Sequence, residues 1–265
     1  MTHATLDPYQ KGDSLLHRLD ARVHLPLTLA FILVTALLPF SAWPAYVLLT
    51  ALVWAIALLS DLGIGYVLKR SLIALPFALA AIPVLFTIPG ETLFSIGSWQ
   101  ISQPGAERLL SVLLKSWISV QAAILLAATH TLSELLLAMR ALRLPRLLVS
   151  VMGLMWRYLY VMVEEAGRMM RAREARSAAP IGSARHLGGS LAFRARVTGG
   201  MAGSLLLRSF ERSERVYAAM LARGYDGEVR SLPTPGVRTA HKTILWAGLL
   251  VLAGILFIGI IAGAG

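Results

Sequence analysis

The sequence predicts an all-α, polytopic membrane protein with about five transmembrane helices and amphipathic helices in a cytoplasmic region. The composition is the first reason, because 57% of the 265 residues are hydrophobic and only 15% are charged. Globular domains are closer to 45–50% apolar and about 25% charged. The second reason is that apolar stretches near the roughly 20 residues needed to cross a bilayer recur along the chain, and the mean hydropathy is +0.68. The third is a strong asymmetry in the placement of Lys and Arg.

Five stretches have the length and composition of membrane spans. They are residues 25–40, 43–59, 71–89, 109–129 and 243–262. Pro76 and Pro83 interrupt the third stretch, which membrane helices tolerate when neighbours bind the freed carbonyls. Lys115 lies in the fourth stretch, where a polar group either marks a transport path or reaches the interface; we favour the interfacial role.

The basic residues predict the orientation. Residues 131–242 hold 18 of the 25 Lys and Arg residues and 8 of the 14 acidic residues, and so carry ten of the eleven net positive charges. Cytoplasmic loops are enriched in Lys and Arg. We therefore predict a cytoplasmic N-terminus, a membrane domain at 1–130, a cytoplasmic coupling-helix region at 131–242, and a final transmembrane helix within 243–265. The 90–108 segment is expected to be an external loop.

The first half of the cytoplasmic region predicts one long helix. Apolar and polar residues alternate with a helical period over 147–176, and Glu164 and Arg168 are spaced as an i,i+4 ion pair. Pro145 separates this helix from 132–142, which we expect to be a turn region, because the residue before proline avoids the helical conformation.

A second amphipathic helix is predicted from about Leu205 to Arg223, after a loop at 177–189. Gly224 follows it directly, and glycine is common just beyond a helix end. The predicted apolar face carries Leu206, Phe210, Tyr217, Met220 and Leu221, and the charged face carries Arg208, Glu211, Arg212 and Arg215. Gly199, Gly200 and Gly203 precede it, and we expect them to allow close helix packing.

Sequence motifs for catalysis and cofactor binding are absent. There is no cysteine, no phosphate-binding GxxxxGK[ST] loop, no HExxH and no Gly-x-Ser-x-Gly. No two histidines have metal-ligand spacing on one helix; the six are His3, His17, His24, His130, His186 and His241. The sequence therefore predicts a non-enzymatic coupling or scaffolding subunit with no catalytic residue, no metal site and no cofactor of its own.

Two short motifs resemble those of a known family. Residues 216–227, with Ala222-Arg223-Gly224 at their centre, resemble the second signature of the transmembrane (T) component of energy-coupling factor (ECF) transporters. Ala175-Arg176-Ser177 has the position of the first signature, with serine where the family has glycine. Residues 16–22 and 131–145 also resemble family segments. The N-terminal segment and residues 223–227 are most similar to those of the cobalt-type, CbiQ-like members.

The resemblance implies a scaffold in the bacterial inner membrane. ATP-binding ABC subunits would dock on Ala175, Arg176, Ser177, Ala222, Arg223 and Gly224, at the ends of two coupling helices. A separate cobalt-binding membrane subunit, the S component, would capture the substrate for cobalamin biosynthesis, and ATP would bind only to the partner ATPase. A planar guanidinium at a helix tip suits such docking, since it can bind carboxylates bidentately; the simpler alternative is that each arginine only caps its own helix.

Four other functions stay open at this point. The chain could serve uptake of nickel or of a vitamin, or it could be a conventional ABC permease, for which Glu165-Ala166-Gly167 is a poor match. An intramembrane enzyme is a further alternative, which the absence of catalytic motifs disfavours. A membrane interaction protein that binds lipid or nucleic acid through its basic region is the last alternative, and we expect lipid contact and no nucleic acid.

Overall fold

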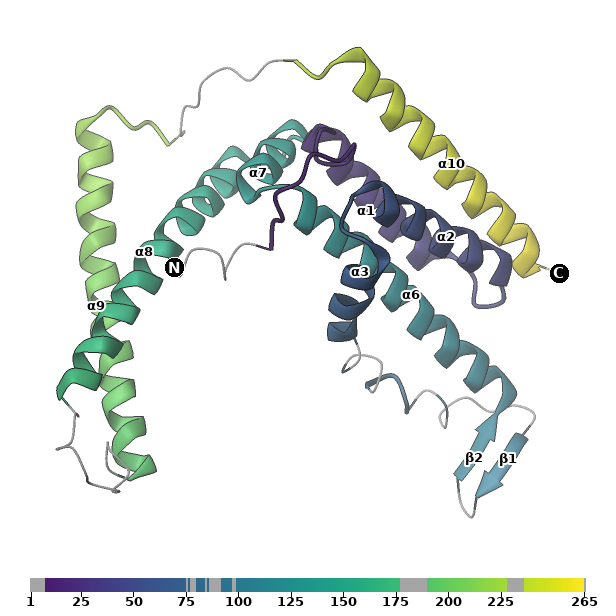
Figure 1. Ribbon diagram of the computed structural model, residues 1–265, viewed down its shortest axis with the longest axis horizontal. Helices are drawn as coiled ribbons and strands as arrows, with labels where there is room; N and C mark the ends of the chain where they lie inside the picture. Colours follow the sequence, from purple (N-terminus) through teal and green to yellow (C-terminus); the bar gives the residue numbers. More distant parts are fainter. Residues whose placement is uncertain are drawn as a thin grey trace. The chain divides into compact units, whose positions relative to one another are not determined.

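The computed structural model describes residues 8–74, 76, 80–83, 85, 92–96, 99–176, 190–227 and 236–264. Regular structure is almost entirely helical, which confirms the all-α fold class (Figure 1). The chain divides into two compact units, one made of residues 7–142 with 234–265 and the other of residues 143–233. The topological boundaries at 130 and 243 remain predictions, because compactness does not report the side of a membrane.

Within the described residues, three helices are long and apolar enough to cross a membrane: α6 (Gln103–Thr129), α8 (Arg146–Arg176) and α10 (Thr239–Ala264). Two shorter apolar helices, α1 (Ala21–Leu37) and α2 (Trp43–Leu59), correspond to the first two predicted spans. The chain is thus a membrane protein, and four of the five predicted spans correspond to the helices α1, α2, α6 and α10. The composition of α8 allows a span, although its amphipathic pattern predicts a cytoplasmic helix.

The segment between α2 and α6 differs from the prediction. A short helix α3 (Ile64–Ser71) and a 3-10 turn η2 (Leu72–Ala74) come first. Much of the third predicted span, 71–89, lies outside the described residues and stays a prediction. In place of a plain external loop, β1 (Thr92–Ile96) and β2 (Trp99–Ser102) pair as an antiparallel hairpin. Runs of four or five residues are too short for a strand pattern to stand out in an apolar sequence.

Local chemistry sets the ends of α1. The Asp20 side chain accepts a hydrogen bond from the Arg22 backbone N–H at 2.9 Å, so the helix begins four residues before the predicted span. It ends at Leu37, because Leu38 precedes Pro39 and adopts an extended ψ of 140°. The N-terminal motif that resembles the ECF family therefore supplies the N-cap of the first membrane helix.

The start of α6 has a similar cause. Ser102 is its N-cap and accepts a hydrogen bond from the Gly105 N–H at 3.2 Å, which extends the helix six residues beyond the predicted span. By contrast, α2 has the predicted bounds. Its Pro44 lies in the first turn, where a missing N–H costs nothing.

The predicted turn region at 132–142 is wrong, because these residues form helix α7 (Leu132–Ala141). Thr131 and Glu134 make a capping box: the Glu134 N–H donates to the Thr131 hydroxyl at 3.4 Å, and the Thr131 N–H donates to the Glu134 carboxylate at 3.0 Å. The helix ends at Ala141, before the positive φ of 61° at Arg143, and Pro145 directly precedes the start of α8.

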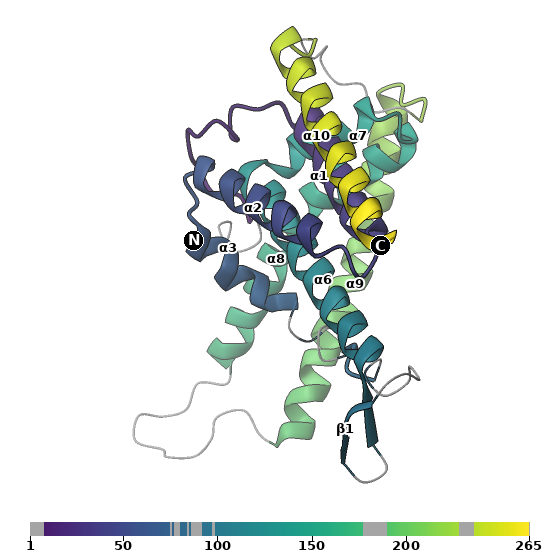
Figure 2. The same ribbon diagram turned by 90° about the vertical axis from the view of Figure 1, so that its right-hand side faces the viewer.

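Helix α10 lies alongside α1 and α2 in both views (Figures 1 and 2). Glycines on α10 allow the close approach. A Cβ placed on Gly259 would overlap Leu38 and lie 3.1 Å from the Ala45 Cβ, and one on Gly263 would overlap Pro39. The two glycines are four residues apart, which is the small-residue spacing of tightly packed membrane helices. Most of the buried residues belong to this bundle of α1, α2, α6 and α10.

Lys115 binds the end of a neighbouring helix. Its Nζ donates to the Leu38 carbonyl at 2.6 Å and to the Ala36 carbonyl at 3.1 Å. These carbonyls belong to the last turn of α1, which has no intrahelical donor for them. A cation is also favourable at the negative end of the helix dipole. Lys115 therefore acts as a C-terminal cap for α1.

Replacing Lys115 with Met is expected to lower the free energy of unfolding by about 1–2 kcal/mol, because two carbonyls lose a charged donor in an apolar environment. Thermal unfolding of the detergent-purified chain measures the effect. Lys115→Arg keeps a donor and should lose less. An unchanged midpoint for Lys115→Met would show that the cap contributes nothing.

Candidate functional site: a helix pair with arginine tips

Residues 143–233 contain two long helices, α8 and α9 (Leu191–Ala222), which run antiparallel. The contacts between them show the direction. Arg208 on α9 donates to the Glu165 carboxylate on α8 at 2.7 Å, and Arg173 on α8 donates to the Thr198 hydroxyl on α9 at 3.0 Å. Residue numbers rise along one helix as they fall along the other. The C-terminal half of α8 therefore faces the N-terminal half of α9.

Helix α8 matches its prediction, but α9 begins about 14 residues earlier than expected. Ser190 caps its start by accepting a hydrogen bond from the Phe193 N–H at 3.3 Å. On the predicted charged face, Arg208 binds Glu165 of α8. On the predicted apolar face, Leu206 and Phe210 are 57% and 61% exposed.

The glycines of α9 do not have the packing role expected of them. A Cβ placed on Gly199, Gly200 or Gly203 would meet no described atom within 4 Å. These residues lie on a helix that crosses α8 without a close backbone contact at this point. The prediction of tight packing is therefore wrong within the described chain.

The end of α9 is a Schellman motif built around Gly224. The Tyr225 N–H donates to the Met220 carbonyl at 3.0 Å, and the Gly224 N–H donates to the Leu221 carbonyl at 2.9 Å. Gly224 has a φ of +79°, which is unfavourable for residues with a Cβ. The Ala222-Arg223-Gly224 motif thus stops the helix abruptly. The Arg223 side chain is exposed at the stop.

The other predicted tip is the last residue of α8. Ala175 and Arg176 are both exposed and helical, whereas Ser177 lies outside the described residues. Ala222 is exposed in the same way as Ala175. Both arginines therefore have a small neighbour and an accessible guanidinium, as the docking hypothesis requires. Their docking role is a prediction that no contact in this single chain tests.

The two tips lie at opposite ends of the helix pair. Arg176 is within one turn of Arg173, which binds Thr198 near the start of α9. Arg223 is 25 residues further along α9. At a rise of 1.5 Å per residue, the tips are on the order of 40 Å apart. The sequence motifs alone do not reveal this separation.

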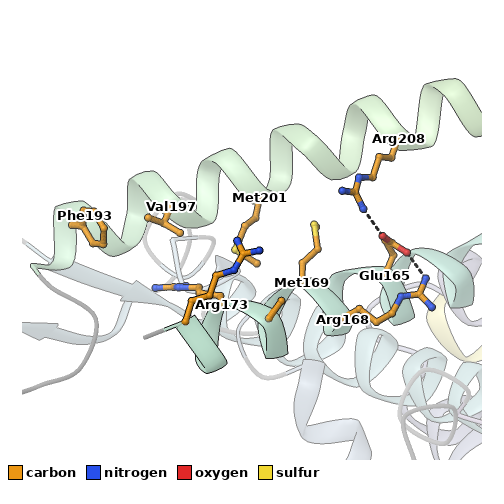
Figure 3. Close-up of a pocket in the computed structure, with 10 residues that line it drawn as sticks. Glu165, Arg168, Met169, Arg173, Phe193, Val197, Met201 and Arg208 are labelled. Atoms are coloured by element: carbon orange, nitrogen blue, oxygen red, sulfur yellow. Dashed lines mark hydrogen bonds and ion pairs between the residues drawn. The ribbon is translucent and has the colours of Figure 1, made fainter. Parts of the chain in front are cut away.

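A hollow lies between the helices near each tip. The hollow nearer Arg223 has a volume of about 400 Å³. Its lining is mostly apolar and consists of Val151, Leu154, Met155, Tyr158, Met162, Ser209, Arg212, Ser213, Val216, Tyr217, Met220 and Tyr225. The hollow nearer Arg176 measures about 600 Å³ and is lined by four arginines (Figure 3). Methionines from both helices line these spaces, as flexible thioethers suit irregular contacts.

A buried histidine pair lies in the other unit, although the sequence showed these histidines only as scattered residues. The His130 Nε2 and His24 Nδ1 atoms are 2.9 Å apart and both side chains are buried. Burial lowers the pKa of His130, and the Glu134 carboxylate opposes that shift. No three potential metal ligands converge among the described side chains. The pair joins the start of α1 to the end of α6, 106 residues apart.

The chain matches known transport subunits over most of its length. Residues 12–234 match the family model CbiQ, described as cobalt transport protein. The chain is 26% identical to the energy-coupling factor transporter transmembrane protein EcfT of Bacillus subtilis, covering 97% of this chain and 98% of that protein. EcfT of Thermosediminibacter oceani is 25% identical, with 86% of each chain covered. EcfT of Streptococcus thermophilus is 27% identical, with 96% and 95% covered. The chain therefore belongs to the CbiQ family and is a transmembrane T component of the energy-coupling factor type.

Proposed function

We propose that this chain is the scaffold of an ATP-driven cobalt importer in the bacterial inner membrane, with its N-terminus in the cytoplasm. ABC subunits bind ATP and dock on the two arginine tips. A separate membrane subunit captures Co²⁺, which is the substrate and not a resident metal of this chain. The chain itself performs no catalysis and transmits motion between the other subunits.

The observation that carries this proposal is the placement of Arg176 and Arg223 at opposite ends of one antiparallel helix pair. Two ATPase subunits related by a symmetry axis present two equivalent docking grooves some distance apart. A helix pair with one exposed guanidinium at each end can occupy both grooves at once. The Schellman stop at Gly224 keeps the Arg223 tip at a fixed position on its helix.

The packing between α8 and α9 supports a coupling role. Neither helix contains a buried residue, and polar contacts join them at the crossing, where Glu165, Met169 and Arg173 meet α9. A change in the crossing angle between α8 and α9 would therefore expose little additional apolar area and cost little free energy. When ATP binding changes the distance between the ATPase subunits, the tips follow and the helices pivot about this crossing.

The substrate assignment rests on the family description, which names cobalt transport. The EcfT relatives carry names that specify energy coupling but no metal. Cobalt is therefore the best-supported cargo, and nickel or a vitamin is the alternative that an uptake experiment separates.

The test is uptake by cells that express this chain with the ATPase and capture subunits encoded beside its gene. We expect accumulation of radioactive Co²⁺ to several times background, abolished when the ATPase phosphate-loop lysine is replaced. Ni²⁺ and labelled vitamins should stay at background. Accumulation of Ni²⁺ or a vitamin in place of Co²⁺ would overturn the cargo but keep the scaffold. Failure of the ATPase to co-purify with this chain would overturn both.

A further inference from the structure

The hollow nearer Arg176 combines a positive rim with an apolar wall (Figure 3). Its volume is about 600 Å³, and its lining residues are Glu165, Arg168, Met169, Ala172, Arg173, Arg176, Phe193, Val197, Met201 and Arg208. Figure 3 shows Phe193, Val197 and Met201 in a row along α9, with the Arg173 side chain extending toward them from α8. A ligand of this hollow must satisfy both kinds of surface.

The charge of the lining is strongly positive. Four arginines face a single carboxylate, Glu165. That carboxylate is shared, because Arg208 donates to it at 2.7 Å and Arg168 binds it as well. Arg168 also pairs with Glu164, which does not line the hollow. Two carboxylates beside four guanidinium groups still leave the hollow a net cationic site. An anion with several acceptor oxygens, such as a phosphate, matches planar guanidinium donors.

The apolar wall narrows the choice of anion. Five lining residues, Met169, Ala172, Phe193, Val197 and Met201, offer no charge or strong hydrogen-bond donor. The lining residue Phe193 is 56% exposed, and Leu191, two residues before it, is 84% exposed. A free inorganic anion would leave this surface uncovered. A phospholipid supplies a phosphate and a hydrocarbon chain in one molecule.

The surrounding helices also favour lipid over an acidic protein segment. Helix α8 has the composition of a membrane-crossing helix, yet none of its apolar window is buried within the chain. On α9, Leu206 and Leu207 are 57% and 66% exposed. An acidic peptide would bring a polar backbone against this surface, whereas acyl chains cover it without unpaired polar groups. Basic sites on membrane proteins bind anionic headgroups for the same electrostatic reason.

We propose that the hollow between the C-terminal half of α8 and the N-terminal half of α9 binds one anionic phospholipid. Its phosphate lies among Arg168, Arg173 and Arg208, and an acyl chain lies along Phe193, Val197 and Met201. The bound lipid bridges the two helices at their crossing. Its headgroup adds negative charge to a lining in which Glu165 is the carboxylate among the described residues.

Native mass spectrometry of the full-length chain, released from detergent with defined lipid, tests this proposal. We expect one phosphatidylglycerol molecule to bind about tenfold more tightly than phosphatidylcholine with the same acyl chains. Arg168→Gln with Arg173→Gln should abolish this preference. The matched control, Arg157→Gln with Arg215→Gln, neutralises one exposed arginine on each helix outside the hollow and should keep it.

Three outcomes would overturn the proposal. Equal binding of phosphatidylglycerol and phosphatidylcholine would show that the arginines do not select an anionic headgroup. Unchanged phosphatidylglycerol binding by the Arg168/Arg173 variant would place the lipid elsewhere. Displacement of the lipid by millimolar inorganic phosphate would reduce the hollow to a simple anion site. A fourth contrary outcome comes from preparations purified together with the ATPase: loss of the ATPase but not the lipid from that variant would assign the hollow to the ATPase interface.

Discussion

Reversing both tip charges, Arg176→Glu with Arg223→Glu, is expected to release the ATPase from this chain. Both tip arginines are exposed, so the substitutions bury no charge within the described fold. A glutamate that faces acidic groups of a partner groove costs about 2 kcal/mol or more per tip. Binding should therefore fall by roughly thirtyfold at the least, and by more if both tips bind at once. Co-purification in detergent and ATP-driven uptake measure the loss.

The control for this prediction has the same change in net charge. Arg157→Glu with Arg215→Glu alters exposed arginines away from the tips, one on each helix. We expect the ATPase to remain bound to it. Equal loss from both double variants would mean that overall charge, and not the tips, holds the ATPase. Intact binding and uptake by the tip variant would refute the docking assignment.

Gly259→Val is expected to displace α10 from the membrane bundle. A Cβ at this position overlaps Leu38, which is 2% exposed, and lies 3.1 Å from the Ala45 Cβ, which is fully buried. Neither neighbour can move into free space, so the cost should be about 2–3 kcal/mol, as for other overpacked sites. Thermal unfolding in detergent and protease resistance of the C-terminal helix report the change.

Gly254→Val provides the comparison on the same helix. A Cβ on Gly254 meets nothing described within 4 Å, and the intrinsic helix propensity changes by the same amount in both variants. We expect Gly254→Val to unfold at nearly the wild-type temperature. If the two variants lost equal stability, the cost would come from the backbone and not from packing against α1 and α2.

The sequence predicted the elements whose signals are local. Helix α2 has the predicted bounds because an apolar run begins directly at Trp43-Pro44. For helix α7 the sequence carries two opposed signals: Thr131-x-x-Glu134 is a capping-box pattern that favours a helix, whereas the nearby Pro145 indicates a break. The early start of α9 was missed because Gly199 and Gly200 disfavour helix and mask the Ser190 cap.

Features that depend on long-range register could not be predicted. The Arg208–Glu165 pair requires knowledge that α8 and α9 are antiparallel and how they are aligned. The His24–His130 contact joins residues 106 positions apart. The motifs at Arg176 and Arg223 identified the candidate tips, but their placement at opposite ends of the pair follows only from the contacts between helices.

The absence of buried residues in α8 and α9 has a consequence for the life of the protein in the cell. Helices without a fully buried residue depend strongly on what binds them, so their folded fraction depends on the concentration of those binding partners by mass action. A newly made chain without partners presents exposed leucine and phenylalanine side chains to chaperones and proteases. The steady-state amount of this subunit should therefore follow the supply of the subunits and lipids that cover it.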